Sequence, residues 1–596
     1  MFSLHFWVFS RCRGRTRRPN YTRIECIENN SLVRAALLRV LALLVGWLAV
    51  AHVSITHARD PIDRAVLEAF LDGVIETAMQ EAGVVGVTLA VTQDDEIALL
   101  KGYGFGNLDE QLEVDPRKTL FRIGSVSKLF TWTGLMQLRE QGQVDFDTDI
   151  NEYLTTLQVP DTFEQAVTLR HLLTHSAGFE ERIVRLFGDE ARDMLPSSVI
   201  LNAELPARVR PPGVVSSYSN HGVGLAGLVL EEVSGQSWES YVQEHILVPL
   251  EMTDATAFQP LPEAIAPQMS AGFRPINGQP AAQEFVYVPM GSAGGMSASA
   301  LAMTRFARAH LGDGSVDGGR ILRSESVAEM RQPYFDVHPN IKPWLYGFAN
   351  YSEGDLFIYG HSGGTRQFTT QFLLIPEHNI SLFVSTNTRG GKKVTSAVHR
   401  QFLDRYFPSE SSPFDAVAVP DLETYTGNWS TYRNAETTPD RLLRLTREVQ
   451  VRKARGDRLR ITGLDRKPTY WTPVGVDEFR REDKDTTLLV GTRIRSGDGH
   501  CGHYWPEPLV LADVSLSGLE ESCWFVDQLR WRKVLTCGEA NRLAPVACDH
   551  ERIRLRFGIE REPCLWLVVH REGDASGDLF RTGDHCFSCL WDAKAA

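Results

Sequence analysis

Residues 121–128 read Phe121-Arg122-Ile123-Gly124-Ser125-Val126-Ser127-Lys128 and place the spacing S-x-x-K at the head of a helix predicted from Ser125 to Gln141. Positions three apart share one face of a helix, so the Lys128 amine can approach the Ser125 hydroxyl. A serine hydroxyl is a weak nucleophile unless an adjacent base accepts its proton. Burial favours the neutral lysine that can act as this base, and the apolar residues that follow predict such burial. The spacing therefore predicts a serine nucleophile with a lysine base.

Two further motifs follow downstream in the same order. Tyr218-Ser219-Asn220 comes after a Pro-Pro-Gly loop, and His361-Ser362-Gly363-Gly364 comes after a strand predicted at residues 356–359. A phenol can relay a proton, and an asparagine amide can hold a substrate carbonyl. Glycines admit a substrate backbone, and the Gly364 N–H can act as an oxyanion donor beside the Ser125 N–H at the helix start.

Each motif is weak by itself, because short patterns recur by chance. Tyr432-Arg433-Asn434 and His500-Cys501-Gly502 match the second and third patterns in the C-terminal tail. These copies lack the context of a Pro-Gly loop or a strand edge, so we assign them no role. The order of the main set within one cysteine-free region favours a single site.

The composition of the chain is that of a soluble globular protein. It has 596 residues, of which 43% are hydrophobic and 23% charged, which excludes a mostly disordered chain and a polytopic membrane protein. The net charge of −13 disfavours nucleic acid as a partner. Cysteine is absent between Cys26 and Cys501, so the central region needs no disulfide framework.

The first part of the chain differs from the rest. Residues 1–58 are basic and contain the unbroken apolar run Val40–Ala51. Twelve apolar residues behind arginines are typical of a signal peptide and short for a membrane-spanning helix. We expect an exported protein, periplasmic or extracellular, with anchoring to the membrane by this segment as the alternative.

The central region predicts an α+β domain over residues 59–407. Helical periodicity marks Ile62 to Ala82, and two strand-like runs around Thr92-Gln93-Asp94-Asp95 predict a hairpin. Mixed and helical segments follow to about residue 260, and strands at residues 356–359, 367–375 and 380–385 precede a helix at 394–406. Strands at both ends predict an antiparallel sheet flanked by the N- and C-terminal helices, with a mostly helical subdomain between them.

The C-terminal third predicts smaller units. Residues 408–420 are rich in proline and serine and form a linker, and residues 421–496 contain the alternating runs of a small β domain. Residues 497–596 are rich in cysteine and tryptophan with little periodicity, and either a disulfide-bearing tail or an out-of-frame translation accounts for them. Cys586-Phe587-Ser588-Cys589 has no second pair at zinc spacing.

The motif set resembles the serine β-lactamase and penicillin-binding-protein-like family, of the class C and D-alanyl-D-alanine carboxypeptidase type, over about residues 60–405. The segments that carry the resemblance are Phe121–Lys128, His171–Phe179, Tyr218–Asn220, Gly294–Ser297 and Gly360–Gly364. The resemblance implies that Ser125 is the acylated nucleophile, with Lys128 and Tyr218 as base and proton shuttle. It also implies that Asn220, His361, Ser362, Gly363 and Gly364 bind substrate and that the Ser125 and Gly364 N–H groups form the oxyanion hole. We expect no cofactor or metal.

The third motif departs from the family pattern, in which a lysine stands where His361 stands here. A lysine is a permanent cation that attracts a substrate carboxylate, whereas a histidine at its reference pKa of about 6.5 is mostly neutral near pH 7. The departure disfavours β-lactams and D-alanyl-D-alanine ends as substrates. It favours an esterase, an aminopeptidase or another amide hydrolase.

Three functions stay open at this point. The first is a serine hydrolase acting on a small-molecule or peptide substrate through an acyl-enzyme; the second is a catalytically silent ligand-binding or sensor module of the cell envelope; the third is a structural envelope protein.

A zinc site at His171 and His175 is disfavoured, because Leu172 stands where the motif H-E-x-x-H needs glutamate. We interpret both histidines as capping and turn residues. The sequence leaves the oligomeric state open.

Overall fold

The structure is a computed structural model, and the chain divides into two units, residues 1–60 and 61–596. All of the described residues belong to the second unit. With side chains these are 62–183, 185–336, 342–408, 421–427, 432–438, 440–441, 449–463, 467–475 and 478–481, apart from the side chain of residue 424. The backbone alone is described for 428–429, 487–490, 511–513, 533–536, 552–560, 564–571 and 578–581. The predicted signal peptide and almost all of the predicted linker lie outside these residues. None of the helices within them has the length and apolar character that a bilayer crossing requires.

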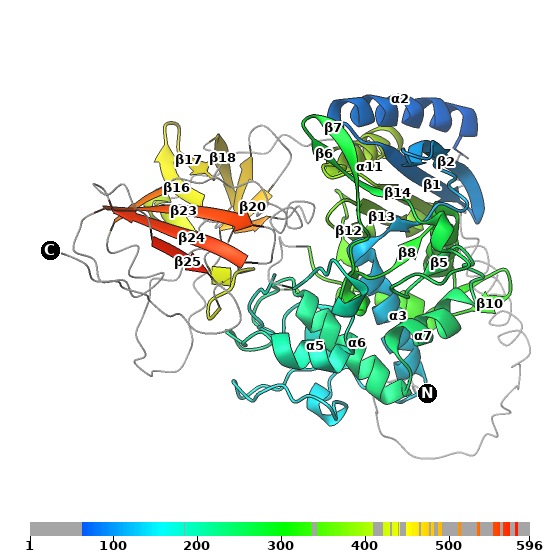
Figure 1. Ribbon diagram of the computed structural model, residues 1–596, viewed down its shortest axis with the longest axis horizontal. Helices are drawn as coiled ribbons and strands as arrows, with labels where there is room; N and C mark the ends of the chain where they lie inside the picture. Colours follow the sequence, from blue (N-terminus) through cyan, green and yellow to red (C-terminus); the bar gives the residue numbers. More distant parts are fainter. Residues whose placement is uncertain are drawn as a thin grey trace, which may run out of the picture. The chain divides into compact units, whose positions relative to one another are not determined.

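A seven-stranded antiparallel sheet forms the centre of the fold (Figure 1). Its spatial order is β11-β12-β13-β14-β1-β2-β3, so the last long strand pairs with the first, with Val87 opposite Thr386. The strands are β1 (Gly86–Gln93), β2 (Glu96–Asn107), β3 (Leu112–Glu113), β11 (Ala349–Asn350), β12 (Tyr359–Gly364), β13 (Thr369–Ile375) and β14 (Ile380–Thr386).

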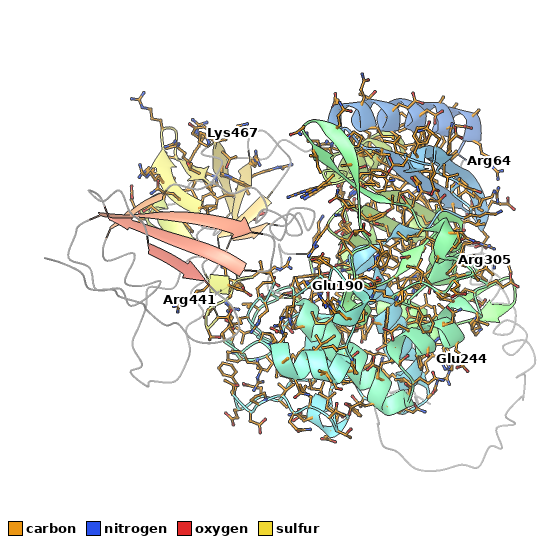
Figure 2. The ribbon with its side chains drawn as sticks, in the orientation of Figure 1. Arg64, Glu190, Glu244, Arg305, Arg441 and Lys467 are labelled. Carbon is orange, nitrogen blue, oxygen red and sulfur yellow. The ribbon has the colours of Figure 1, made fainter. Side chains whose placement is uncertain are left out.

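Helices from the two ends of the domain cover one face of this sheet. α2 (Arg64–Ala82) and α11 (Lys392–Tyr406) pack against each other, and their apolar sides join those of β1, β13 and β14 in one cluster. Asp63 caps α2 by accepting from the Ala65 and Val66 N–H groups, as an N-cap carboxylate does. The Arg64 side chain, at the exposed start of α2, pairs with Glu96 of β2 at 3.4 Å (Figure 2). The predicted terminal helices are therefore confirmed.

The other face of the sheet packs on α9 (Ala300–Leu311) and, through it, on a helical subdomain. Phe306 of α9 stacks on Phe130 with ring centroids 4.1 Å apart and contacts Phe372 of β13. These rings belong to a large apolar cluster that runs from the sheet into the helices. The helices are α3 (Ser127–Glu140), α4 (Leu169–Leu173), α5 (Ser197–Glu204), α6 (Asn220–Ser234), α7 (Trp238–Val242), α8 (Gly291–Gly294) and α10 (Ser324–Met330).

Short strands complete the domain. They form a three-stranded sheet and two two-stranded hairpins, made by β4 (Phe121–Arg122), β8 (Ser297–Ala298) and β5 (Ala255–Thr256), by β6 (Gly272–Ile276) and β7 (Gln279–Gln283), and by β9 (Ser315–Val316) and β10 (Gly319–Arg320). β4 leads directly into the turn that carries Ser125 and pairs with β8, so this small sheet fixes the entry to α3. The α+β class predicted from the sequence is confirmed.

The C-terminal region is rich in β-strands. An antiparallel sheet contains β15 (Gly427–Trp429), β16 (Val449–Ala454), β17 (Arg458–Thr462), β18 (Pro468–Gly475), β19 (Glu478–Arg481), β20 (Thr487–Val490) and β21 (Leu511–Asp513). Leu459 and Phe479 are at the centre of its apolar cluster. A second sheet contains β22 (Lys533–Thr536), β23 (Arg552–Glu560), β24 (Cys564–Arg571) and β25 (Asp578–Arg581).

Candidate active site

Ser125 and Lys128 meet at the start of α3. A 3₁₀ turn over Gly124–Val126 precedes the helix, and the Lys128 Nζ donates to the Ser125 Oγ over 3.0 Å. The same nitrogen donates to the Asn220 Oδ1 at 2.8 Å and to the Ala293 carbonyl oxygen at 2.5 Å. Lys128 is fully buried. Its amine is thus held against the serine hydroxyl by acceptors from two other helices.

Tyr218 lies in the loop that leads into α6, and Asn220 is the first residue of that helix. Ser219 caps this helix by accepting from the Gly222 N–H at 3.0 Å, which places Asn220 in the first turn. The Lys128 Nζ lies 5.0 Å from the centroid of the Tyr218 ring. The second motif is therefore brought beside the first, although Asn220 is 92 residues from Lys128 in sequence.

The backbone of β12 lies directly against the Ser125 turn. A Cβ added to Gly363 would lie 1.9 Å from the Ile123 oxygen and 3.0 Å from the Ser125 nitrogen, and one added to Gly124 would lie 2.5 Å from the Gly364 nitrogen. Only glycine permits this approach, and Gly124 also adopts a left-handed φ of 53°. Ser125 and Gly364 both line the pocket.

His361 is buried in β12 rather than placed after a strand. The strand expected at residues 356–359 begins only at Tyr359 and contains the whole motif, because Tyr359–Gly364 pair continuously with β13. Burial, and then the nearby Lys128 charge, lower the pKa of His361 to about 3. Its Nδ1 contacts the Ser362 carbonyl oxygen at 2.5 Å. The imidazole is therefore neutral at physiological pH.

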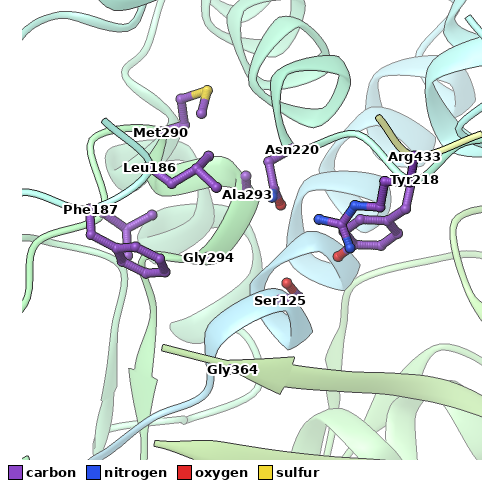
Figure 3. Close-up of a pocket in the computed structure, with 11 residues that line it drawn as sticks. Ser125, Leu186, Phe187, Tyr218, Asn220, Met290, Ala293, Gly294, Gly364 and Arg433 are labelled. Carbon is purple, nitrogen blue, oxygen red and sulfur yellow. The ribbon is translucent and has the colours of Figure 1, made fainter. Parts of the chain in front are cut away.

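The pocket is lined by polar side chains on one side and by apolar side chains on the other (Figure 3). Its lining residues are Ser125, Leu186, Phe187, Tyr218, Asn220, Val288, Met290, Ala293, Gly294, Gly364 and Arg433. Of the residues predicted from the sequence, Ser125, Tyr218, Asn220 and Gly364 are in this set. Lys128 is buried behind Ser125. His361, Ser362 and Gly363 lie in β12 beside the pocket and do not line it.

The two histidines of the His171–Phe179 segment have local structural roles. The His171 Nδ1 accepts from the Thr168 N–H at 3.1 Å at the start of α4. His175 adopts a left-handed φ of 54°, and its Nδ1 accepts from the Ser219 N–H at 3.3 Å. Burial first, and then the Lys128 charge, hold the pKa of His175 well below its usual value. Its ring packs on Tyr218 with centroids 4.3 Å apart, so it supports the second motif.

Sequence reasoning missed the apolar walls and Arg433. Leu186 and Phe187 come from the loop before α5, and Val288 and Met290 come from the loop before α8. The Arg433 guanidinium carbon lies 4.8 Å from the centroid of the Tyr218 ring. No periodicity or motif marks these positions, because they meet only through contacts between distant loops. Sequence reasoning assigns no role to the triplet 432–434.

Comparison with known proteins places the domain that carries this pocket in a family. The family model described as Beta-lactamase matches residues 71–404. Penicillin-binding protein 4 of Amycolatopsis lactamdurans is 28% identical over 325 residues, which are 50% of this chain and 83% of that protein. Protein flp of Staphylococcus aureus strain MW2 is 24% identical over 327 residues, which are 53% of this chain and 62% of that protein.

Two solved structures share the fold. The octameric penicillin-binding protein homologue from Pyrococcus abyssi has a TM-score of 0.51 at 21% identity and covers 84% of this chain and 98% of its own. The crystal structure of SurE has a TM-score of 0.53 at 23% identity and covers 75% of this chain and 98% of its own. Because the family model spans more than half of the sequence, the chain belongs to the Beta-lactamase family.

Proposed function

We propose that this protein is a serine hydrolase that cleaves an ester or amide bond through an acyl-enzyme on Ser125. Family membership supports hydrolase chemistry in general. The observation that carries the specific proposal is the Lys128 Nζ, 3.0 Å from the Ser125 Oγ at the floor of a pocket. A hydroxyl beside a buried amine is the arrangement that converts serine into a nucleophile.

In the proposed reaction, the Ser125 Oγ attacks the substrate carbonyl carbon and its proton passes to the Lys128–Tyr218 pair. The Ser125 and Gly364 N–H groups stabilise the negative charge on the carbonyl oxygen. The bond to the leaving group breaks as that group takes up the proton. Water then attacks the acyl-enzyme by the same route, which releases the acid and restores Ser125. The Asn220 side chain orients Lys128 and contacts the substrate.

The pocket supports a substrate with an apolar acyl group. Leu186, Phe187, Val288 and Met290 contribute apolar side chains to its wall, and burial of apolar substrate surface against them favours binding. His361, with its pKa lowered to about 3, provides no cation for a substrate carboxylate near pH 7. The Arg433 guanidinium in the pocket wall is already paired with the Glu181 carboxylate. An ester, or a peptide with an apolar residue before the scissile bond, fits this surface better than a β-lactam.

Export of the protein is part of the proposal. It rests on the apolar run Val40–Ala51 behind a basic segment, which lies outside the described residues. Small-molecule or peptide substrates of the cell envelope are the expected partners.

A substrate screen with the purified full chain tests the reaction class. We expect p-nitrophenyl esters or D-amino-acid anilides to give a burst of about one product per enzyme molecule followed by steady turnover, and nitrocefin to react more slowly. The burst is the signature of an acyl-enzyme. A folded protein that binds these compounds with neither burst nor turnover would instead be the silent ligand-binding module.

A further inference from the structure

A segment beyond the predicted linker docks against the rim of the active site. We refer to residues 432–438 as the strap; it follows β15. The Thr437 N–H donates to the Glu180 carboxylate at 2.7 Å, and the Glu181 N–H donates to the Asn434 carbonyl oxygen at 3.1 Å. The strap is thus held by the loop of residues 180–183, which follows the His171–Phe179 segment.

A second set of contacts holds the strap beside the second motif. The Arg210 Nη2 donates to the Glu436 carboxylate at 2.6 Å, and the Arg210 guanidinium lies over the Tyr432 ring at 4.9 Å. The Ser217 Oγ donates to the Tyr432 carbonyl oxygen at 3.3 Å. Because Ser217 directly precedes Tyr218, the strap is fixed at the residue next to the phenol.

Arg433 is the strap residue that enters the pocket wall. Its Nε donates to the Glu181 carboxylate, and the side chains of this pair are only 6% and 3% exposed. A charged pair withdrawn from water to this extent is costly unless its geometry is well satisfied. The guanidinium lies 4.8 Å from the centroid of the Tyr218 ring (Figure 3). The pair therefore presents a fixed cation to the phenol.

The other titratable groups around Tyr218 are Lys128, 5.0 Å from the ring centroid, and the imidazoles of His175 and His361, with centroids at 4.3 and 6.0 Å. Burial lowers the pKa of both histidines far enough to keep them neutral. Among the described residues in these contacts, the side chains of Lys128 and Arg433 are thus the cations that face the ring. The Glu181 carboxylate partly offsets the positive charge of Arg433.

We propose that Arg433 is a positioning residue for Tyr218, supplied to the active site by the C-terminal region. Its guanidinium, anchored by Glu181, holds the phenol beside Lys128 and favours the deprotonated form of the Lys128–Tyr218 pair that accepts the Ser125 proton. This role rests on the proposed hydrolase function. A nearby cation favours the deprotonated state of either a phenol or an amine, so the expected direction does not depend on which of the two accepts the proton first.

The test compares the pH dependence of kcat/KM for one uncharged p-nitrophenyl ester across variants of the full chain. In R433M, we expect kcat/KM near neutral pH to fall about 10- to 100-fold and the ascending limb of the profile to move up by about one pH unit. In E181Q, the guanidinium keeps its charge and loses its counter-ion, so the limb is expected to move to lower pH. Opposite shifts distinguish electrostatic action on the base from a general loss of structure.

R210M is the matched control. It removes another arginine that docks the strap, through Glu436, but that does not belong to the pocket lining. We expect the ascending limb of its kcat/KM profile to stay at the wild-type pH. An ascending limb that stays at the wild-type pH in R433M would overturn the role of Arg433. An upward shift in R210M as large as the shift in R433M would overturn it as well. If R433M does not fold, E181Q decides the question. An ascending limb that stays at the wild-type pH or moves to higher pH in E181Q contradicts the proposal.

Failure of this inference is distinguishable from failure of the proposed function. A wild-type chain that shows neither burst nor turnover contradicts the hydrolase itself. A wild-type chain that turns over, with variants whose profiles do not shift as stated, contradicts only the role of Arg433.

Discussion

Replacing Ser125 by alanine is expected to abolish the ester burst and to lower turnover by at least about 10⁴-fold. The reason is that Ser125 is the hydroxyl that the Lys128 amine contacts at 3.0 Å on the pocket floor. Without it no covalent intermediate forms, and only unassisted attack by water remains. The burst amplitude in stopped-flow absorbance, set against enzyme concentration, measures the effect.

Ser127 provides the matched control for this substitution. It lies two residues away and is fully buried, and its Oγ donates to the Gly124 carbonyl oxygen at 2.6 Å and accepts from the Met296 N–H at 3.0 Å. S127A is therefore expected to lower the free energy of unfolding by about 1–2 kcal/mol while keeping the burst. A burst that survives in S125A, or that disappears only in S127A, would contradict the assignment of the nucleophile.

Replacing Lys128 by methionine is expected to lower the acylation rate by about 10²- to 10⁴-fold, the usual contribution of a general base. Methionine keeps most of the buried volume but cannot accept the Ser125 proton. The Asn220 Oδ1 and the Ala293 carbonyl oxygen also lose a donor, so the free energy of unfolding should fall by about 1–3 kcal/mol. Single-turnover kinetics with excess enzyme separate the two effects, because the folded fraction is measured independently.

A surface lysine controls for the loss of charge. Lys101 is partly exposed, and its amine pairs with Glu68 at 2.6 Å and Asp72 at 2.9 Å on the side of the sheet covered by α2. K101M is expected to acylate at the wild-type rate. Acylation of K128M within about threefold of the wild-type rate would show that another group accepts the serine proton.

The parts of this site that could be predicted from the sequence are those fixed by local spacing. The i, i+3 relation of Ser125 and Lys128 follows from helix geometry alone, and the structure places the two groups in contact. The α+β class followed from periodicity at the two ends of the domain. No local rule links Tyr218 and Gly364 to Ser125, because these positions lie far apart in the chain. Their convergence was predicted from the order of the motifs and from the resemblance.

The remaining features depend on tertiary contacts that leave no local trace. The pairing of Tyr359 with Leu374 draws the third motif into β12, whereas the sequence placed it after a strand that ended at residue 359. Arg433 and Glu181 are separated by 252 residues, and neither lies in a periodic segment. The contact between them arises from the tertiary arrangement of the loops that carry them.

The most direct test of the central claim is the position of a covalent adduct. The full chain is incubated with a fluorophosphonate, digested and mapped by mass spectrometry. A single adduct on the peptide that contains Ser125, absent from S125A and present in S127A, is the predicted result. A folded chain that stays unmodified, or that carries its adduct on another residue, would contradict an acyl-enzyme at Ser125.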